Sequence, residues 1–157
     1  MTTQQKFMQA AIRLAINNVK NNQGGPFGAV IVKDGQIIAR GVNRVTGTHD
    51  PTAHAEVEAI RAACRELGTF ALTGCEIYCS CQPCPMCLGA IYWARPARVY
   101  YAATKEDAAA IGFDDAFIYR EIDLPPAQRK LPSVQLLHNE ALEPFRLWQE
   151  STHKVEY

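Results

Sequence analysis

Four residues in two short segments of this chain could together bind a metal ion and move protons. His54 and Glu56 form a His-x-Glu pair, and Cys84 and Cys87 follow Pro83 in a Pro-Cys-x-x-Cys segment. One imidazole and two thiolates suit Zn²⁺, and three protein ligands leave the fourth tetrahedral position open for water. A carboxylate such as Glu56 beside that water can take its proton and return protons to a substrate. The four residues therefore predict a catalytic zinc site.

Each pair alone has a plainer interpretation. A lone His-x-Glu is more often a helix cap beside a solvated charge. A lone Cys-x-x-Cys could be redox-active, or part of a structural zinc site closed by Cys64, Cys79 or Cys81. Found together in this order, the two pairs match the known signature of zinc-dependent nucleobase deaminases. A non-catalytic zinc domain remains the alternative, and the number of protein ligands distinguishes it from an enzyme.

Both segments are expected at the N-terminal ends of helices. Asp50 is a plausible N-cap with Pro51 at the first helical position, which predicts a helix from Ala53 to Leu67 that ends at Gly68. Residues two apart point to nearly opposite sides of a helix, so the His-x-Glu pair can converge only at its end. The positive dipole end of a second helix, from Pro85 to Ala94, would favour thiolates.

The remaining segments predict an α/β fold. A strand, helix, strand order around the Pro85–Ala94 helix favours a parallel pair, and Asp34-Gly35 predicts an antiparallel hairpin. We expect a three-layer α/β/α sandwich with a mixed sheet of five strands. The segments expected besides the two helices above are a helix over Gln4–Asn22, strands over Ala29–Val32, Ile37–Ala39, Glu76–Ser80, Arg98–Ala102 and Val134–Leu137, helices over Lys105–Ile111 and Leu142–Thr152, and an irregular stretch from Phe113 to Pro132.

Composition fits a single enzyme-sized domain with no polyanionic partner. The chain has 157 residues, 48% of them hydrophobic, and its 16 basic and 16 acidic residues cancel. A neutral balance gives no overall attraction to a phosphate backbone, so no nucleic-acid partner is expected. The start resembles no signal peptide and no stretch has the length of a membrane span, so we expect no membrane partner and a cytoplasmic location with reduced thiols.

Larger stretches of the chain resemble the small bacterial guanine deaminases, which belong to the cytidine deaminase-like superfamily. The resemblance is carried by Gly25–Val32, Asp50–Glu56, Ser80–Arg95 and Gly112–Asp115. It implies a mixed five-stranded sheet between helices and the hydrolytic deamination of guanine to xanthine and ammonia. It also implies one Zn²⁺ per subunit held by His54, Cys84 and Cys87, with Glu56 as the proton shuttle.

The same resemblance implies substrate contacts and a dimer. It suggests that Asn43 bonds the purine edge, that Phe27 packs against the ring, that Ala55 adjoins the base and that Asp115, or else Asp114, contacts the exocyclic amine. It further implies a single domain over residues 1–157 whose segment 132–157 is exchanged within a homodimer. Trp93 and Tyr157 would then approach the neighbouring subunit's site. Adenosine deamination in tRNA, and deamination of other nucleobases or nucleosides, remain alternatives because they share the zinc ligands.

Overall fold

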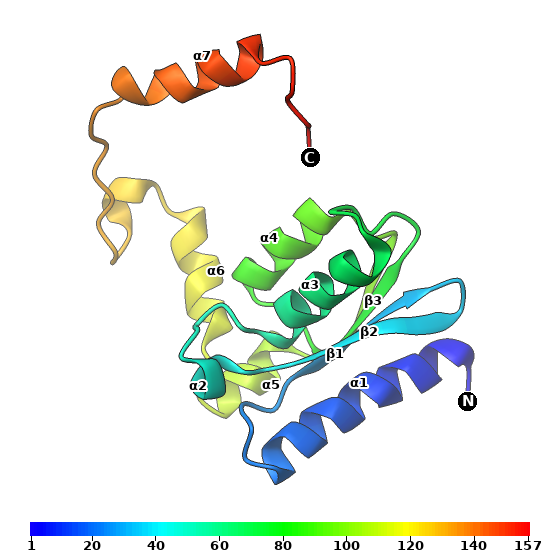
Figure 1. The fold of residues 1–157 in the computed structure, drawn as a ribbon. Helices are drawn as coiled ribbons and strands as arrows, with labels where there is room; N and C mark the ends of the chain where they lie inside the picture. The colour runs from blue at the N-terminus through cyan, green and yellow to red at the C-terminus, as the bar shows by residue number, and fades with distance from the viewer. The chain divides into compact units, whose positions relative to one another are not determined.

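A sheet of four strands organises residues 1–119, and its most buried strand is the first half of the predicted hairpin. The computed structural model describes all 157 residues, which form two compact units, residues 1–119 and 120–157. The strands are β1 (Gly28–Lys33), β2 (Gln36–Val42), β3 (Glu76–Cys81) and β4 (Arg98–Ala103). The α-helices, drawn in Figure 1, are α1 (Thr3–Lys20), α2 (Val45–Thr48), α3 (Ala55–Leu67), α4 (Pro85–Ala94), α5 (Lys105–Ala110), α6 (Asp115–Asp123) and α7 (Glu143–Glu150), and two 3₁₀ turns cover Pro126–Gln128 and Glu140–Leu142.

The sheet is mixed and has the order β2-β1-β3-β4. Strand β1 pairs antiparallel with β2 and β3, whereas β3 and β4 run parallel. A parallel pair needs a crossover connection, and α4 provides it. Asp34 and Gly35 adopt left-handed backbone conformations with φ of 48° and 74°, the geometry that makes Asp-Gly favourable in a two-residue hairpin turn. The predicted hairpin and parallel pair are confirmed.

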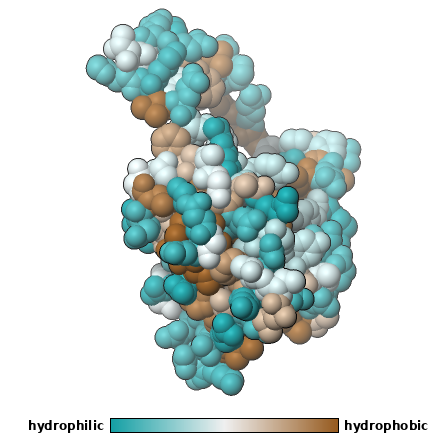
Figure 2. Space-filling model, turned by 90° about the vertical axis from the view of Figure 1, so that its right-hand side faces the viewer, coloured by the Kyte–Doolittle hydropathy of each residue, from teal (hydrophilic) through white to brown (hydrophobic).

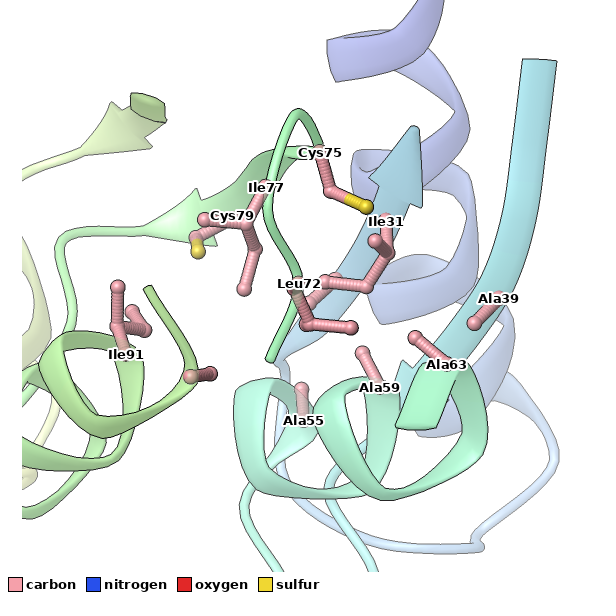
Figure 3. Packing of buried hydrophobic residues seen from close by; sticks show 12 residues of the cluster. Ile31, Ala39, Ala55, Ala59, Ala63, Leu72, Cys75, Ile77, Cys79 and Ile91 are labelled. Atoms are coloured by element: carbon pink, nitrogen blue, oxygen red, sulfur yellow. The ribbon is translucent and has the colours of Figure 1, made fainter. Parts of the chain in front are cut away.

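Helices cover both faces of this sheet. Alternate residues of a strand point to opposite faces, so Val30 and Tyr78 pack towards α1, whereas Ile31 and Ile77 pack towards α3 and α4. Figure 3 shows the second cluster, in which small alanines of α3 lie close to the sheet. The predicted three-layer α/β/α sandwich is confirmed. None of the helices is both long enough and apolar enough to cross a membrane.

Glycine at position 41 lets the first turn of α3 lie very close to β2. A Cβ atom at Gly41 would come within 2.1 Å of the Ala55 carbonyl oxygen and 2.5 Å of the Ala59 nitrogen. A larger residue could not be placed there unless α3 moved. Because His54 directly precedes α3, this close packing also fixes the position of His54.

The prediction of a fifth strand over Val134–Leu137 is wrong. Residues 132–137 have no regular secondary structure, and Val134 and Leu136 are 79% and 78% exposed. A strand needs another strand to satisfy its backbone hydrogen bonds, and no strand of this chain pairs with the segment. The sheet within one chain therefore has four strands.

The start of α3 and the stretch after Phe113 also differ from the prediction. Helix α3 begins at Ala55, not Ala53, and its N-cap is His54. Asp50 instead accepts hydrogen bonds from the amide and hydroxyl of Thr52, at 2.8 and 2.7 Å, which forms a separate turn before the helix. Helix α6 occupies part of the stretch predicted to be irregular, and the Asp114 carboxylate accepts a hydrogen bond from the amide of Phe117 (3.0 Å) at its start.

The unit of residues 120–157 contains no buried residue. Its first part is held by Arg129, whose guanidinium donates to the carbonyl oxygens of Glu121 and Leu124 at 3.1 and 3.0 Å. In α7, the exposed Arg146 pairs with Glu143 and Glu150.

Large apolar side chains are exposed in both units of the chain. On the face shown in Figure 2, apolar groups (brown) reach the surface in patches among hydrophilic ones.

Candidate zinc active site

The two signature segments meet at the N-terminal ends of α3 and α4. His54 is the N-cap of α3 and has extended backbone dihedrals. Cys84 is the N-cap of α4, its sulfur accepts the amide hydrogen of Cys87 at 3.5 Å, and Pro85 occupies the first turn. Proline suits that position because its missing amide hydrogen would have no partner there. The local sequence thus places one imidazole and two thiols beside the N-terminal ends of α3 and α4, where the positive ends of both helix dipoles lie.

The ligand atoms have the spacing that tetrahedral zinc requires. His54 Nδ1 lies 3.5 Å from Cys84 Sγ and 3.4 Å from Cys87 Sγ, and the three ligand atoms are within 4.8 Å of one another. Tetrahedral angles and ordinary Zn–N and Zn–S bond lengths separate nitrogen from sulfur by about 3.6 Å. No fourth His, Cys, Asp or Glu joins the group. The residues therefore fit one zinc ion with a free coordination position, and they do not form a closed structural site.

Glu56 lies beside the ligands as a buried carboxyl group. It is 8% exposed, and its Oε2 accepts a hydrogen bond from the thiol of Cys87 at 3.4 Å. Burial removes water from the carboxylate and raises its pKa. A carboxyl group whose pKa lies closer to neutral is better suited to take up and release protons.

The ionisation of the ligands is unequal. A hydrogen bond from the Cys87 thiol lowers the pKa of Cys84 to about 4, and the same hydrogen bond raises the pKa of Cys87. A hydrogen bond with Cys84 also raises the pKa of His54. Because a thiolate is the form that binds a metal, this hydrogen-bonded pair of cysteines favours one thiolate among the ligands.

A cavity of about 700 Å³ adjoins the ligand group, within residues 1–119. This volume lies in the range of small-molecule sites. Five residues that the sequence singles out line the cavity together, although up to 88 positions separate them along the chain: Phe27, Asn43, His54, Glu56 and Asp115. Cys84 lines it as well. Of the two adjacent acids, Asp115 lines the cavity and Asp114 does not. Burial raises the pKa of the Asp115 carboxyl group.

The amide of Asn43 has a defined orientation. Its Oδ1 accepts hydrogen bonds from the amides of Gly25 and Val45, both at 3.3 Å, so its NH₂ group is the polar group left for the cavity. The ring of Phe27 packs edge-on against Phe113, with centroids 4.9 Å apart and planes at 87°. The substrate side of the cavity therefore offers a hydrogen-bond donor and an aromatic surface.

Three of the predicted substrate-binding residues do not line this cavity. Ala55 is buried as the first residue of α3. Trp93, on α4, and Tyr157, in the unit of residues 120–157, are 63% and 68% exposed. Since the sequence assigns Trp93 and Tyr157 to the neighbouring subunit's site, their roles remain predictions.

Gln82 and Phe113 line the cavity but were not given roles by the sequence. Gln82 directly precedes Pro83 and accepts a hydrogen bond from the amide of Lys105 at 3.3 Å. Phe113 belongs to the segment Gly112–Asp115 that carries the family resemblance. Closeness to a motif was the only signal for either residue, because contacts between distant segments leave no trace in sequence spacing.

Comparison with known families identifies the class to which this fold and site belong. Residues 1–103 match the cytidine and deoxycytidylate deaminase zinc-binding region, a match that contains His54, Glu56, Cys84 and Cys87. The chain belongs to this family of zinc-binding deaminases, and His54, Cys84 and Cys87 are positioned to hold its single zinc ion.

Individual relatives resemble the chain over different lengths. The guanine deaminase of Bacillus subtilis (strain 168) is 58% identical over 151 residues, which is 96% of this chain and 97% of that protein. The X-ray structure of guanine deaminase from Bacillus subtilis matches with a TM-score of 0.95 at 57% identity and covers 98% of both chains. The tRNA-specific adenosine deaminase of Agrobacterium fabrum is 46% identical over 86 residues, 55% of this chain and 57% of that protein. The similarity to guanine deaminase therefore extends beyond the zinc-binding region.

Proposed function

We propose that this protein catalyses the hydrolytic deamination of guanine to xanthine and ammonia. The observation that carries this function is the match to Bacillus subtilis guanine deaminase over 96% of the chain, which includes the tail that the zinc-binding region, residues 1–103, leaves out. The zinc ligands define the reaction type, and the rest of the chain supports guanine as the substrate.

His54, Cys84 and Cys87 hold the metal, and zinc, when bound, makes water acidic and polarises the group to be attacked. Glu56 takes a proton from the attacking water, whose oxygen forms a bond to C2 of guanine. Glu56 delivers this proton to N3, then takes the remaining proton from the new hydroxyl group at C2 and delivers it to the exocyclic nitrogen, so that the C2–N bond breaks, ammonia leaves and C2 keeps the oxygen as a carbonyl. Its raised pKa supports this shuttle, since the same carboxyl group must accept and donate protons.

Three residues on the cavity wall support recognition of a purine base. The amide NH₂ group of Asn43 donates to an acceptor on the purine edge, and the ring of Phe27 packs against the base. The Asp115 carboxylate accepts a hydrogen bond from the exocyclic amine. The Asn43 donor also favours guanine over adenine at this edge, because guanine presents O6 where adenine presents an amino group.

The direct test measures ammonia release by the zinc-loaded protein from guanine, guanosine, adenine, cytosine, cytidine and tRNA. We expect guanine to be turned over far faster than the others. Absence of guanine turnover would refute the proposed function.

Adenosine deamination in tRNA is the second candidate function, and the 46% identity over 86 residues to a tRNA-specific adenosine deaminase favours it. Ammonia release from tRNA and from none of the other substrates would support this alternative. The net charge of zero favours the small substrate over a polyanion.

We also propose a homodimer in which the segment 132–157 is exchanged between subunits. All of these residues except Ser151 are exposed within one chain, although they include apolar side chains such as Val134, Leu136 and Phe145. Apolar surface of this kind is normally covered by another chain.

We further propose a cytoplasmic location. The six cysteines are free, which is consistent with a reducing compartment.

A further inference from the structure

A buried amide on α1 links the two segments that carry Phe27 and Asn43. Asn18 is 1% exposed and does not line the cavity. Its Nδ2 donates to the carbonyl oxygen of Asn43 at 2.8 Å and to that of Gly25 at 2.9 Å. Two carbonyl acceptors define the orientation of the amide, because only its NH₂ group can donate.

The contacts around Asn18 form a closed network. The Gly25 carbonyl oxygen also accepts the amide hydrogen of Phe27 at 2.8 Å, and the Gly25 amide donates to Oδ1 of Asn43 at 3.3 Å. A Cβ atom at Gly24 would come within 2.3 Å of the Asn43 carbonyl oxygen and 3.1 Å of Asn18 Nδ2. The three segments are therefore packed without room for adjustment, and the side chain of Asn18 joins them.

Packing alone does not explain why an amide occupies this position. The Oδ1 atom of Asn18 is buried and has no hydrogen-bond partner in the protein, which is unfavourable. An apolar side chain of similar size would avoid that penalty. What the amide provides is its pair of donor contacts to Gly25 and Asn43.

We propose that Asn18 is a positioning residue for substrate recognition. It holds the backbone of Asn43 and of Gly25, so that Oδ1 of Asn43 stays bonded to the Gly25 amide and the Asn43 NH₂ group faces the cavity. Asn18 thus sets the affinity for the purine without touching it. This inference rests on the proposed function, in which Asn43 binds the substrate.

Steady-state kinetics of Asn18→Ala and Asn18→Leu provide the test. We expect the KM for guanine to rise about tenfold and kcat to change less than about threefold, because the lost contact serves binding and not the proton transfers. Asn18→Leu keeps the branched shape of the side chain without its hydrogen bonds, and thermal unfolding of both variants guards against loss of folding. Asn17→Ala is the matched control, since Asn17 is the exposed neighbour on the same helix. An unchanged KM, or a fall in kcat together with zinc content, would overturn the proposal.

A double-mutant cycle separates positioning from a general structural role. In an Asn43→Ala background, Asn18→Ala should raise KM by less than about twofold, because the amide that it positions is gone while its backbone partner remains. If Asn18→Ala raises KM by the same factor in the wild-type and Asn43→Ala backgrounds, Asn18 does not act through Asn43 and the proposal is contradicted. The wild-type protein tests the proposed function separately: if it deaminates another base, the same cycle is measured on that base, and only the variants bear on Asn18.

Discussion

The proton shuttle proposed for the buried Glu56 is a task that a neutral amide could not perform. Glu56→Gln preserves the size of the side chain and can still receive the hydrogen bond from Cys87, but it cannot carry protons. We predict that guanine turnover falls by roughly 10²- to 10⁴-fold, while the zinc content per subunit stays unchanged. Ammonia release and metal analysis of the same sample measure both quantities. Glu58→Gln, at a partly exposed position on the same helix, is the matched control, and full activity of the Glu56 variant would disprove the shuttle.

Asp115 and Asp114 are adjacent acids with different surroundings. Asp115 lines the cavity, whereas the Asp114 carboxylate caps α6 through the amide of Phe117. Asp115→Asn replaces an acceptor with an amide whose NH₂ group can oppose the exocyclic amine of guanine, and we predict a loss of kcat/KM of about tenfold or more. Asp114→Asn should remain close to wild type, because asparagine also caps helices well. Equal effects at both positions in guanine kinetics would argue against a substrate contact by Asp115.

Among the elements, the contact between β2 and α3 determines the position of a zinc ligand. Gly41→Ala would place a Cβ atom 2.1 Å from the Ala55 carbonyl oxygen, so the start of α3 and His54 must move. We predict weaker zinc binding together with a loss of stability of roughly 1–3 kcal/mol. Competition with a metal chelator and thermal unfolding measure the two effects. Gly89→Ala, on α4 with nothing within 4 Å of its Cβ position, should instead stabilise the protein by roughly 0.5–1 kcal/mol. Unaltered zinc affinity in the Gly41 variant would mean that His54 is positioned by other contacts.

Local signals explain which elements could be predicted from the sequence. Asp34-Gly35 and Gly68 both determine backbone conformation at their own positions, and the structure confirms the hairpin and the end of α3 there. The start of α3 could not be predicted as well, because aspartate is a favoured N-cap residue, whereas the actual N-cap, His54, makes no side-chain capping hydrogen bond. Asp50 instead accepts hydrogen bonds from Thr52. Likewise, Val134–Leu137 has the composition of a strand, but a strand depends on a partner elsewhere.

The residues of the site likewise fall into those that could be found from the sequence and those that could not. The zinc ligands could be found from the sequence because their spacing within each pair reflects the geometry of one helix end, and the order of the two pairs is specific. Gln82 and Asn18 could not, since the contacts that place them, with Lys105 and with Asn43, each span more than twenty positions along the chain. Spacing along the chain carries no information on such contacts.

For the whole molecule, one chain leaves apolar surface exposed and has strand β4 at one of the two edges of its sheet. Strand β4 pairs only with β3, and the segment 132–157 exposes Leu136, Phe145 and Trp148 at 78%, 66% and 45%. An edge strand offers backbone groups to a strand from another chain. Exchange of this segment in a symmetric dimer would cover both features at once, and it would bring Tyr157 of each subunit to the other subunit's site.

Mixed dimers test this exchange by activity. We predict that Glu56→Gln and Tyr157→Ala proteins are each nearly inactive, but that co-refolding them in equal amounts yields about a quarter of wild-type guanine turnover, because half of the random dimers then contain one intact site. The matched control carries both substitutions in one chain and is co-refolded with wild type. With exchange, those mixed dimers have no intact site, whereas without exchange each keeps one. With exchange the second mixture therefore keeps about a quarter of wild-type turnover, all of it from wild-type homodimers, and without exchange it keeps about a half. About a half in the second mixture and none in the first would show that each tail serves its own subunit, and full activity of Tyr157→Ala alone would remove Tyr157 from the site.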